Sequence, residues 1–279
     1  MSTNAATENN LTEPHSSNQK DFLWLHLREL PYFRALVRAV EAEYYQAFDL
    51  PSPILDIGCG DGHFASLTFD KPIDVGVDPW GGPIREAARR NCYRSLIQCD
   101  AGMLPFPANY FGSAISNSVL EHIPHVVDVL IETARVLKPG APFLFCVPNQ
   151  RYLTELSIPA FLAQAGLSGL GGAYTDWFRR MSRVEHAQPP DVWKTWLSNA
   201  GFSLENWWNY FSPRAMRVLE WGHYFGIPTL LPHLLTGRWI LVPERWNLTL
   251  TERIVRPYAQ IEPHPQGTFT FYVARKNNS

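Results

Sequence analysis

The chain has 279 residues with a formal net charge of −2, and 46% of its residues are hydrophobic. This length and apolar content can bury the core of one large or two modest domains without disulfide or metal staples. The charge balance excludes the dense Lys/Arg stripe of a nucleic-acid-binding surface, and four cysteines without CxxC spacing indicate no disulfide scaffold, no structural zinc site and a reduced, cytoplasmic setting.

The first fifty residues are predicted to hold a tail followed by helices. Residues 1–20 are largely polar and have the composition of a disordered tail. Between residues 21 and 50, apolar side chains recur at helical spacing, and Pro31 permits a break and a second helix start.

Strand and helix patterns alternate between residues 51 and 150. Short apolar runs predict strands at residues 53–57, 73–77, 95–99, 112–116 and 141–147. Helix patterns separate them at residues 62–69, 83–90 and 125–137. Alternating units of this size predict an α/β fold with a parallel sheet and helices on both faces.

The alternation of strand and helix patterns ends after Asn149. The patterns predict a helix at residues 191–200, a strand at 202–211, a helix at 214–225 and a final strand at 267–276. Residues 151–279 would therefore complete a mostly parallel, Rossmann-like, doubly wound sheet of seven strands. Two segments, at about 150–189 and 212–266, fall outside this pattern and are predicted to be helical insertions that form a cap.

A glycine-rich loop follows the first predicted strand, with the sequence Asp-Ile-Gly-Cys-Gly-Asp-Gly from Asp56 to Gly62. Its alternating glycines allow a tight turn that brings the backbone against a ligand at the carboxyl end of the strand. A nicotinamide-binding loop would read G-x-G-x-x-G instead. The acids of this loop repel a pyrophosphate and attract a cation, so a nicotinamide or nucleotide enzyme is disfavoured. For Asp61 alone, capping of the following helix is the simpler explanation.

This loop resembles the first motif of the class I S-adenosylmethionine-dependent methyltransferases, particularly their type 11 branch of small-molecule methyltransferases. The resemblance covers about residues 50–150, which would form the cofactor-binding core. It implies that the loop cradles the methionyl part and adenosine of S-adenosylmethionine. The residues that it assigns to this role are Asp56, Gly58, Cys59, Gly60 and Gly62.

The same resemblance extends to the ends of the second and third predicted strands. Asp78, followed by Pro79, stands where the family accepts hydrogen bonds from both ribose hydroxyls. Asp100, followed by Ala101, stands where an acid holds the adenine amino group. Each aspartate also has a simpler explanation, because Asp is common in turns that follow strands.

The segment after the fourth predicted strand contains Asn117, Ser118 and His122, and in the family it lies beside the methionine end of the cofactor and the transferred methyl group. Some relatives bind a divalent metal here through Glu-x-x-Glu-His, but Ser118 occupies the first of these positions, so we expect no metal. His122 is a candidate general base because an imidazole titrates in the useful range. A histidine packed at a helix start is the alternative.

The resemblance implies methyl transfer to a small-molecule acceptor of aromatic, terpenoid or lipid-like character. A non-catalytic S-adenosylmethionine-binding module, with a regulatory or assembly role, is the alternative, since the metal motif is incomplete and no base is obvious. In this family, elements added at the carboxyl edge of the sheet build the acceptor site. The two insertions would then form an apolar lid, unless their aromatic residues are ordinary packing.

The second half of the chain has the composition of a separate specificity region. Eight of the ten tryptophans follow residue 150, and the charge changes from 11 basic and 17 acidic residues before that point to 13 basic and 9 acidic residues after it. Residues 214–243 combine arginines with paired leucines, as in helices that lie on a membrane surface. Peripheral membrane contact, a dimer contact and a lid are alternatives for this segment, and the oligomeric state is left open.

Overall fold

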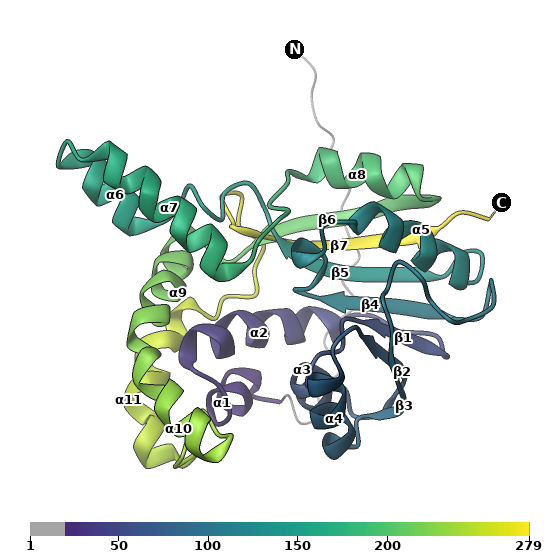
Figure 1. Cartoon of the computed structure of the whole chain (residues 1–279), viewed down its shortest axis with the longest axis horizontal. Helices are drawn as coiled ribbons and strands as arrows, with labels where there is room; N and C mark the ends of the chain where they lie inside the picture. The colour runs from purple at the N-terminus through teal and green to yellow at the C-terminus, as the bar shows by residue number, and fades with distance from the viewer. Residues whose placement is uncertain (1–19, 279) are drawn as a thin grey trace.

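The computed structural model describes residues 20–278, so the predicted tail, apart from Lys20, lies outside the described residues. Figure 1 shows a central sheet, helices on both of its faces and a group of further helices beyond one of its ends. None of the helices in this described part is both long and apolar enough to span a membrane.

The sheet has seven strands in the order β3-β2-β1-β4-β5-β7-β6. The strands are β1 (Ile54–Ile57), β2 (Ile73–Asp78), β3 (Tyr93–Gln98), β4 (Ser113–Asn117), β5 (Pro142–Pro148), β6 (Phe202–Tyr210) and β7 (Phe269–Lys276). β1 to β5 pair in parallel, whereas β7 runs antiparallel to β5 and β6. The predicted mostly parallel, doubly wound sheet is therefore confirmed. Its strand order reverses between β1 and β4, and open α/β sheets bind ligands at the carboxyl ends of the strands beside such a point.

Alternating side chains of each strand contribute to two cores, one on each face of the sheet. In β5, Leu144 and Cys146 belong to one core, and Phe143 and Phe145 belong to the other. The first core is covered by α1 (Phe22–Leu27), α2 (Tyr32–Tyr45) and α3 (His63–Thr68), with α4 (Gly81–Arg90) next to α3. The second core is covered by α5 (Val126–Val136) and α8 (Pro190–Asn199). The break predicted at Pro31 is confirmed, since this residue precedes the first turn of α2.

Both insertions leave the sheet at the end where β5 and β6 finish, because Pro148 and Tyr210 both align with Phe269 at the start of β7. The first contains α6 (Ser157–Gln164) and α7 (Ser168–Ser182), and the second contains α9 (Pro213–Phe225), α10 (Leu230–Thr236) and α11 (Arg245–Val255). Figure 1 shows all five helices gathered beyond this end of the sheet. Single 3-10 turns complete the chain at η1 (Leu120–His122), η2 (Ile227–Thr229) and η3 (Arg256–Tyr258).

Candidate functional site

The glycine-rich loop between β1 and α3 adopts the left-handed conformation at three positions, with φ values of +76° at Gly58, +55° at Gly60 and +70° at Gly62. A Cβ atom at Gly58 would lie 2.3 Å from Val119, and one at Gly62 would lie 3.1 Å from the backbone of Ala87. By contrast, a Cβ atom at Gly60 would meet no atom of the described chain within 4 Å. The outer two glycines thus allow close packing, and the middle one leaves its backbone open to a ligand.

Asp78 ends β2 directly beside this loop and is only 8% exposed. Its Oδ2 accepts a hydrogen bond from the Gly60 amide at 3.1 Å, and its Oδ1 accepts one from the Trp80 amide at 2.9 Å. Burial raises the pKa of Asp78, and the two amide hydrogen bonds oppose that shift. A carboxylate offers about four acceptor positions, so Asp78 keeps capacity for two further donors.

Asp56 and Cys59 lie beneath the loop rather than on its open side. The Asp56 carboxylate is 5% exposed and accepts a hydrogen bond of 2.5 Å from the Tyr93 hydroxyl. The Tyr93 ring passes over Gly76, where a Cβ atom would come within 2.9 Å of it. Burial raises the pKa of Asp56 to about 7. Cys59 is 8% exposed, its Cβ lies close to the same glycine of β2, and its Sγ lies 3.9 Å from the Gly60 carbonyl oxygen.

The loop's second acid, Asp61, has the local role that the sequence offered as the simpler explanation. Its Oδ1 accepts a hydrogen bond of 3.0 Å from the amide of His63 at the start of α3. This contact satisfies one of the free amides in the first turn of the helix.

Asp100 follows β3 and presents one free oxygen. Its Oδ1 accepts hydrogen bonds from the Gly102 amide at 2.8 Å and from His125 Nε2 at 3.0 Å, and these bonds lower the pKa of the carboxyl group. The Asp100 side chain is 55% exposed, and no group in residues 20–278 donates to its Oδ2. Ala101 is buried in the second core.

Two large apolar side chains near these aspartates were missed by the sequence analysis. Trp80, two residues after Asp78, is 70% exposed, and Met103, three residues after Asp100, is 80% exposed. Pro79, between Asp78 and Trp80 in the chain, is also exposed. An apolar residue shortly after a strand-ending acid was the available signal, because exposure of such a side chain suggests a surface that a flat ring can cover.

The end of β4 is joined to α2 by a buried carboxylate that sequence reasoning also missed. Glu41 of α2 is fully buried and accepts hydrogen bonds from Asn117 Nδ2 at 2.8 Å, Ser118 Oγ at 2.9 Å and the Tyr210 hydroxyl at 2.8 Å. Burial raises its pKa, and the three hydrogen bonds oppose the shift. The predicted residues Asn117 and Ser118 are therefore brought together, with their side chains directed at Glu41. A glutamate inside a helix carries no local sign of this position.

His122 lies in the turn after β4 with its two ring nitrogens in different surroundings. Nδ1 lies 2.8 Å from the Arg183 carbonyl oxygen, which can only accept, so Nδ1 carries the proton. Nε2 lies 3.7 Å from Oε1 of Glu121, and the His122 side chain is 42% exposed. Glu121 itself is 3% exposed, and burial raises its pKa to about 7. Its Oε2 has no hydrogen-bond partner within the described residues.

The first insertion is attached to this turn. The amides of Glu185 and His186, just after α7, donate to the Glu121 carbonyl oxygen at 2.8 Å and 3.0 Å.

Within the described chain, no group of three or more His, Cys, Asp or Glu side chains is placed to hold a metal ion.

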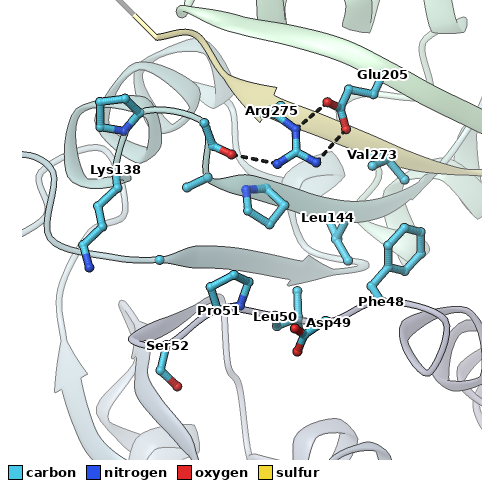
Figure 2. A pocket seen from close by; sticks show the side chains of 15 residues that line it. Phe48, Asp49, Leu50, Pro51, Ser52, Lys138, Leu144, Glu205, Val273 and Arg275 are labelled. Carbon is cyan, nitrogen blue, oxygen red and sulfur yellow. Dashed lines mark hydrogen bonds and ion pairs between the residues drawn. The ribbon is translucent and has the colours of Figure 1, made fainter.

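Two cavities lie in different parts of the described chain. One of about 440 Å³ lies among α1, α3 and α4, borders the glycine loop at Asp61 and His63, and is lined on another side by residues 233–243 of the second insertion. The other, of about 420 Å³, lies where β1 and β5 begin. Figure 2 shows Arg275 in it, paired with Glu205 and donating to the Gly140 carbonyl oxygen. It holds none of the predicted cofactor residues.

Comparisons with known proteins point to one family. Residues 55–145 match the family model described as a methyltransferase domain. A fatty-acid O-methyltransferase from Mycolicibacterium smegmatis is 38% identical over 105 residues, which make up 36% of this chain and 38% of that protein. A ubiquinone biosynthesis O-methyltransferase from Dinoroseobacter shibae is 27% identical over 164 residues, which make up 55% of this chain and 65% of that protein. The match thus spans less than two thirds of either relative.

The structural likeness extends over almost the whole chain. A geranyl diphosphate C-methyltransferase from Streptomyces coelicolor, solved with Mg²⁺, geranyl diphosphate and S-adenosyl-L-homocysteine, matches 96% of this chain and 86% of its own, with a TM-score of 0.51 and 14% identity. At that identity the likeness shows the fold alone. Together with the sequence matches, it shows that residues 55–145 form a class I S-adenosylmethionine-dependent methyltransferase domain of type 11.

Proposed function

We propose that this chain transfers a methyl group from S-adenosylmethionine to a small, apolar acceptor. The observation that carries the proposal is the set of groups at the carboxyl ends of β1, β2 and β3. This set consists of the open backbone at Gly60, the Asp78 carboxylate beside it and the free oxygen of Asp100. It fits a cofactor that has ribose hydroxyls, an adenine amino group and a net positive charge near the sulfur.

Each part of the cofactor has a matching group in the chain. Asp78 would accept from the ribose hydroxyls with its remaining lone pairs, and Asp100 Oδ2 would accept from the adenine amino group. Trp80 and Met103 would cover the adenine ring, which explains why such large apolar side chains stand exposed at these two strand ends.

The methionyl carboxylate requires a cation, and α2 supplies two. Arg38 Nη1 lies 3.5 Å from His63 Nδ1 at the start of α3, and Arg34 interacts electrostatically with Asp61 of the loop. One turn further along α2, Glu41 holds Asn117 and Ser118. We therefore assign to α2 the methionyl end of the site.

The cofactor, when bound, supplies a methyl group already activated by the sulfonium. The chain has to position a nucleophile, exclude water and take up a proton. His122 is suited to the last task, because the Arg183 carbonyl holds the Nδ1 proton and leaves the Nε2 lone pair available. Glu121 beside it would stabilise the imidazolium that forms.

Apolar character of the acceptor is supported by the two insertions. Tyr174 and Trp177 of α7 contact Tyr224 of α9, with a hydrogen bond of 2.7 Å between the two tyrosine hydroxyls. These aromatic side chains stand at the end of the sheet where His122 lies, and the loop after α7 is tied to Glu121. The fatty-acid and ubiquinone-pathway relatives are named for the same broad class of acceptor.

The cofactor part of the proposal is tested by titration calorimetry with S-adenosylhomocysteine. Asp78→Ala should lower the affinity at least about tenfold, as for an orphaned buried hydrogen-bonding group. Trp80→Ala should lower it about threefold to tenfold without a folding defect, because that side chain is 70% exposed. Asp70→Ala, a surface aspartate 80% exposed and paired only with Lys20, is the matched control and should bind normally. Unchanged affinity in both test variants would place the cofactor elsewhere.

The transfer part is tested with labelled S-adenosylmethionine, using a long-chain fatty acid and a substituted phenol as acceptor probes. His122→Gln should lower kcat by about 100-fold while leaving the affinity for S-adenosylhomocysteine unchanged. His264→Gln, in the loop before β7, is the control and should leave kcat unchanged. Cofactor binding without methyl transfer to any acceptor would favour the alternative of a non-catalytic binding module.

A further inference from the structure

The second insertion exposes an unusual stripe along α9. Arg214, Arg217, Trp221 and Phe225 follow one another at spacings of three and four residues, so they share one face of the helix. All four side chains are exposed, Trp221 by 45% and Phe225 by 66%. The opposite face of α9 is buried against the core through Ala215, Met216 and Leu219. On the exposed face, Trp221 donates a hydrogen bond to the Ser157 hydroxyl at 3.0 Å, and its ring remains 45% exposed.

The apolar surface continues on both sides of α9. The ring of Trp177 in α7 stacks near Tyr224, which in turn contacts Trp221. Beyond Phe225, α10 has no buried residue at all, and Leu231, Leu234 and Leu235 are 64%, 79% and 76% exposed. Apolar side chains of this size are seldom left in water over such a length unless something covers them.

The charge around this surface is predominantly positive. Residues 157–182 and 213–258 contain eight arginines and four acids. Of the acids, Glu220 of α9 is buried, with its carboxylate against the first turn of α6. Glu252 is paired with Arg245 and Arg256. No ion-pair partner of Arg214 or Arg217 is found in the described part of the chain. A second copy of the same surface would therefore supply arginines rather than the carboxylates that these arginines lack.

We propose that the α9–α10 surface, formed by Arg214, Arg217, Trp221, Phe225, Leu231 and Leu235, docks on an anionic lipid bilayer. The leucines and aromatic rings would enter the boundary between headgroups and acyl chains, and the arginines would meet lipid phosphates. Tryptophan and arginine are both well accommodated at that depth. The docking is peripheral, because the surface is formed by one face of a helix and a short following helix. It does not depend on the proposed methyl transfer.

The full chain is tested by co-sedimentation with vesicles of phosphatidylcholine alone and of phosphatidylcholine mixed with phosphatidylglycerol. We expect partitioning onto the mixed vesicles that is at least about tenfold stronger than onto phosphatidylcholine and that weakens as salt is raised. Leu231→Glu/Leu235→Glu should lower the partition coefficient at least about tenfold at any salt concentration. Arg214→Glu/Arg217→Glu should remove mainly the preference for phosphatidylglycerol.

Ile131→Glu on α5 is the matched control, because it also converts an exposed apolar side chain, 47% exposed, on a different face of the molecule. It should partition like the unmodified chain. Thermal melting shows whether each variant is folded, and every substituted side chain is exposed. Three results overturn the proposal: no binding to the mixed vesicles at low salt, equal loss in the control, or a dimer in analytical ultracentrifugation that the leucine variant dissociates.

Discussion

Residues 51–150, which contain the methyltransferase domain, and the helical insertions differ in how many large apolar side chains they expose. Residues 51–150 expose four large apolar side chains, whereas residues 157–182 and 213–258, a shorter stretch of chain, expose seventeen. In the first region two buried aspartates are held by hydrogen bonds, Asp56 by the Tyr93 hydroxyl and Asp78 by the Gly60 amide, whereas Oε2 of the buried Glu121 has no partner within the described residues. The first region therefore leaves few large apolar side chains in contact with solvent, whereas the insertions leave many, and it is on the insertions that we propose the acceptor and the membrane to bind.

The largest loss of stability that we expect is in the glycine loop of the first region. Gly58→Ala should destabilise the fold by about 2–4 kcal/mol, because its Cβ would overlap Val119 and the residue has a positive φ. Gly60→Ala should cost only about 1 kcal/mol, yet its Cβ would occupy the open space and lower the affinity for S-adenosylhomocysteine at least about tenfold. Urea unfolding and calorimetry separate the two effects. Equal stability of the two variants would mean that Gly58 is not packed as described.

A second prediction concerns the pH dependence of stability. Burial raises the folded-state pKa of Asp56 to about 7, so the folded state binds this proton more tightly than the unfolded state does. The stabilisation of the folded state by protonated Asp56 is therefore fully present below about pH 4 and is lost as the pH rises through about 7. Asp56→Asn keeps an acceptor for Tyr93 but cannot ionise, so it should flatten the fall in stability between pH 4 and 7, by up to a few kcal/mol.

The matched variant for this experiment is Glu121→Gln, because burial also raises the pKa of Glu121 to about 7. It should flatten the same part of the curve, and the double variant should flatten it further. The measurement is urea unfolding at a series of pH values. An unchanged slope in Asp56→Asn would show that this carboxyl group ionises freely in the folded chain.

The sequence allowed the strands and their ends to be predicted, because turns and acids there are local features. Asp78 and Asp100 were found in this way, since each directly ends or follows a strand. Asp56 shows the limit of the approach. Its side chain is turned beneath the loop because Gly76, one strand away, leaves room for the Tyr93 ring. No feature next to Asp56 in the sequence reports that contact.

The insertions were harder to predict for a different reason. α7 forms across three glycines at positions 169, 171 and 172, and Gly171 is needed for close packing, since its Cβ would lie 3.2 Å from the Pro159 carbonyl oxygen in α6. Propensity argues against a helix there, and tertiary contact overrides it. The segment at 212–266 was predicted to be helical, but the bounds of α10 and α11 were not predicted, because their exposed leucines and tryptophan blur the amphipathic pattern on which helix prediction depends.

The smallest expected effect tests whether the two regions are energetically separate. Glu220 of α9 is fully buried, and its carboxylate accepts from the Ser157 amide and hydroxyl, both at 2.6 Å, and from the Ile158 amide at 3.2 Å. It thus places a negative charge at the first turn of α6. Glu220→Gln should cost about 1 kcal/mol and speed amide exchange in α6, with the affinity for S-adenosylhomocysteine unchanged. A loss of cofactor affinity would show instead that the insertion helps to shape the cofactor site, through the chain segment that joins α7 to the Glu121 carbonyl.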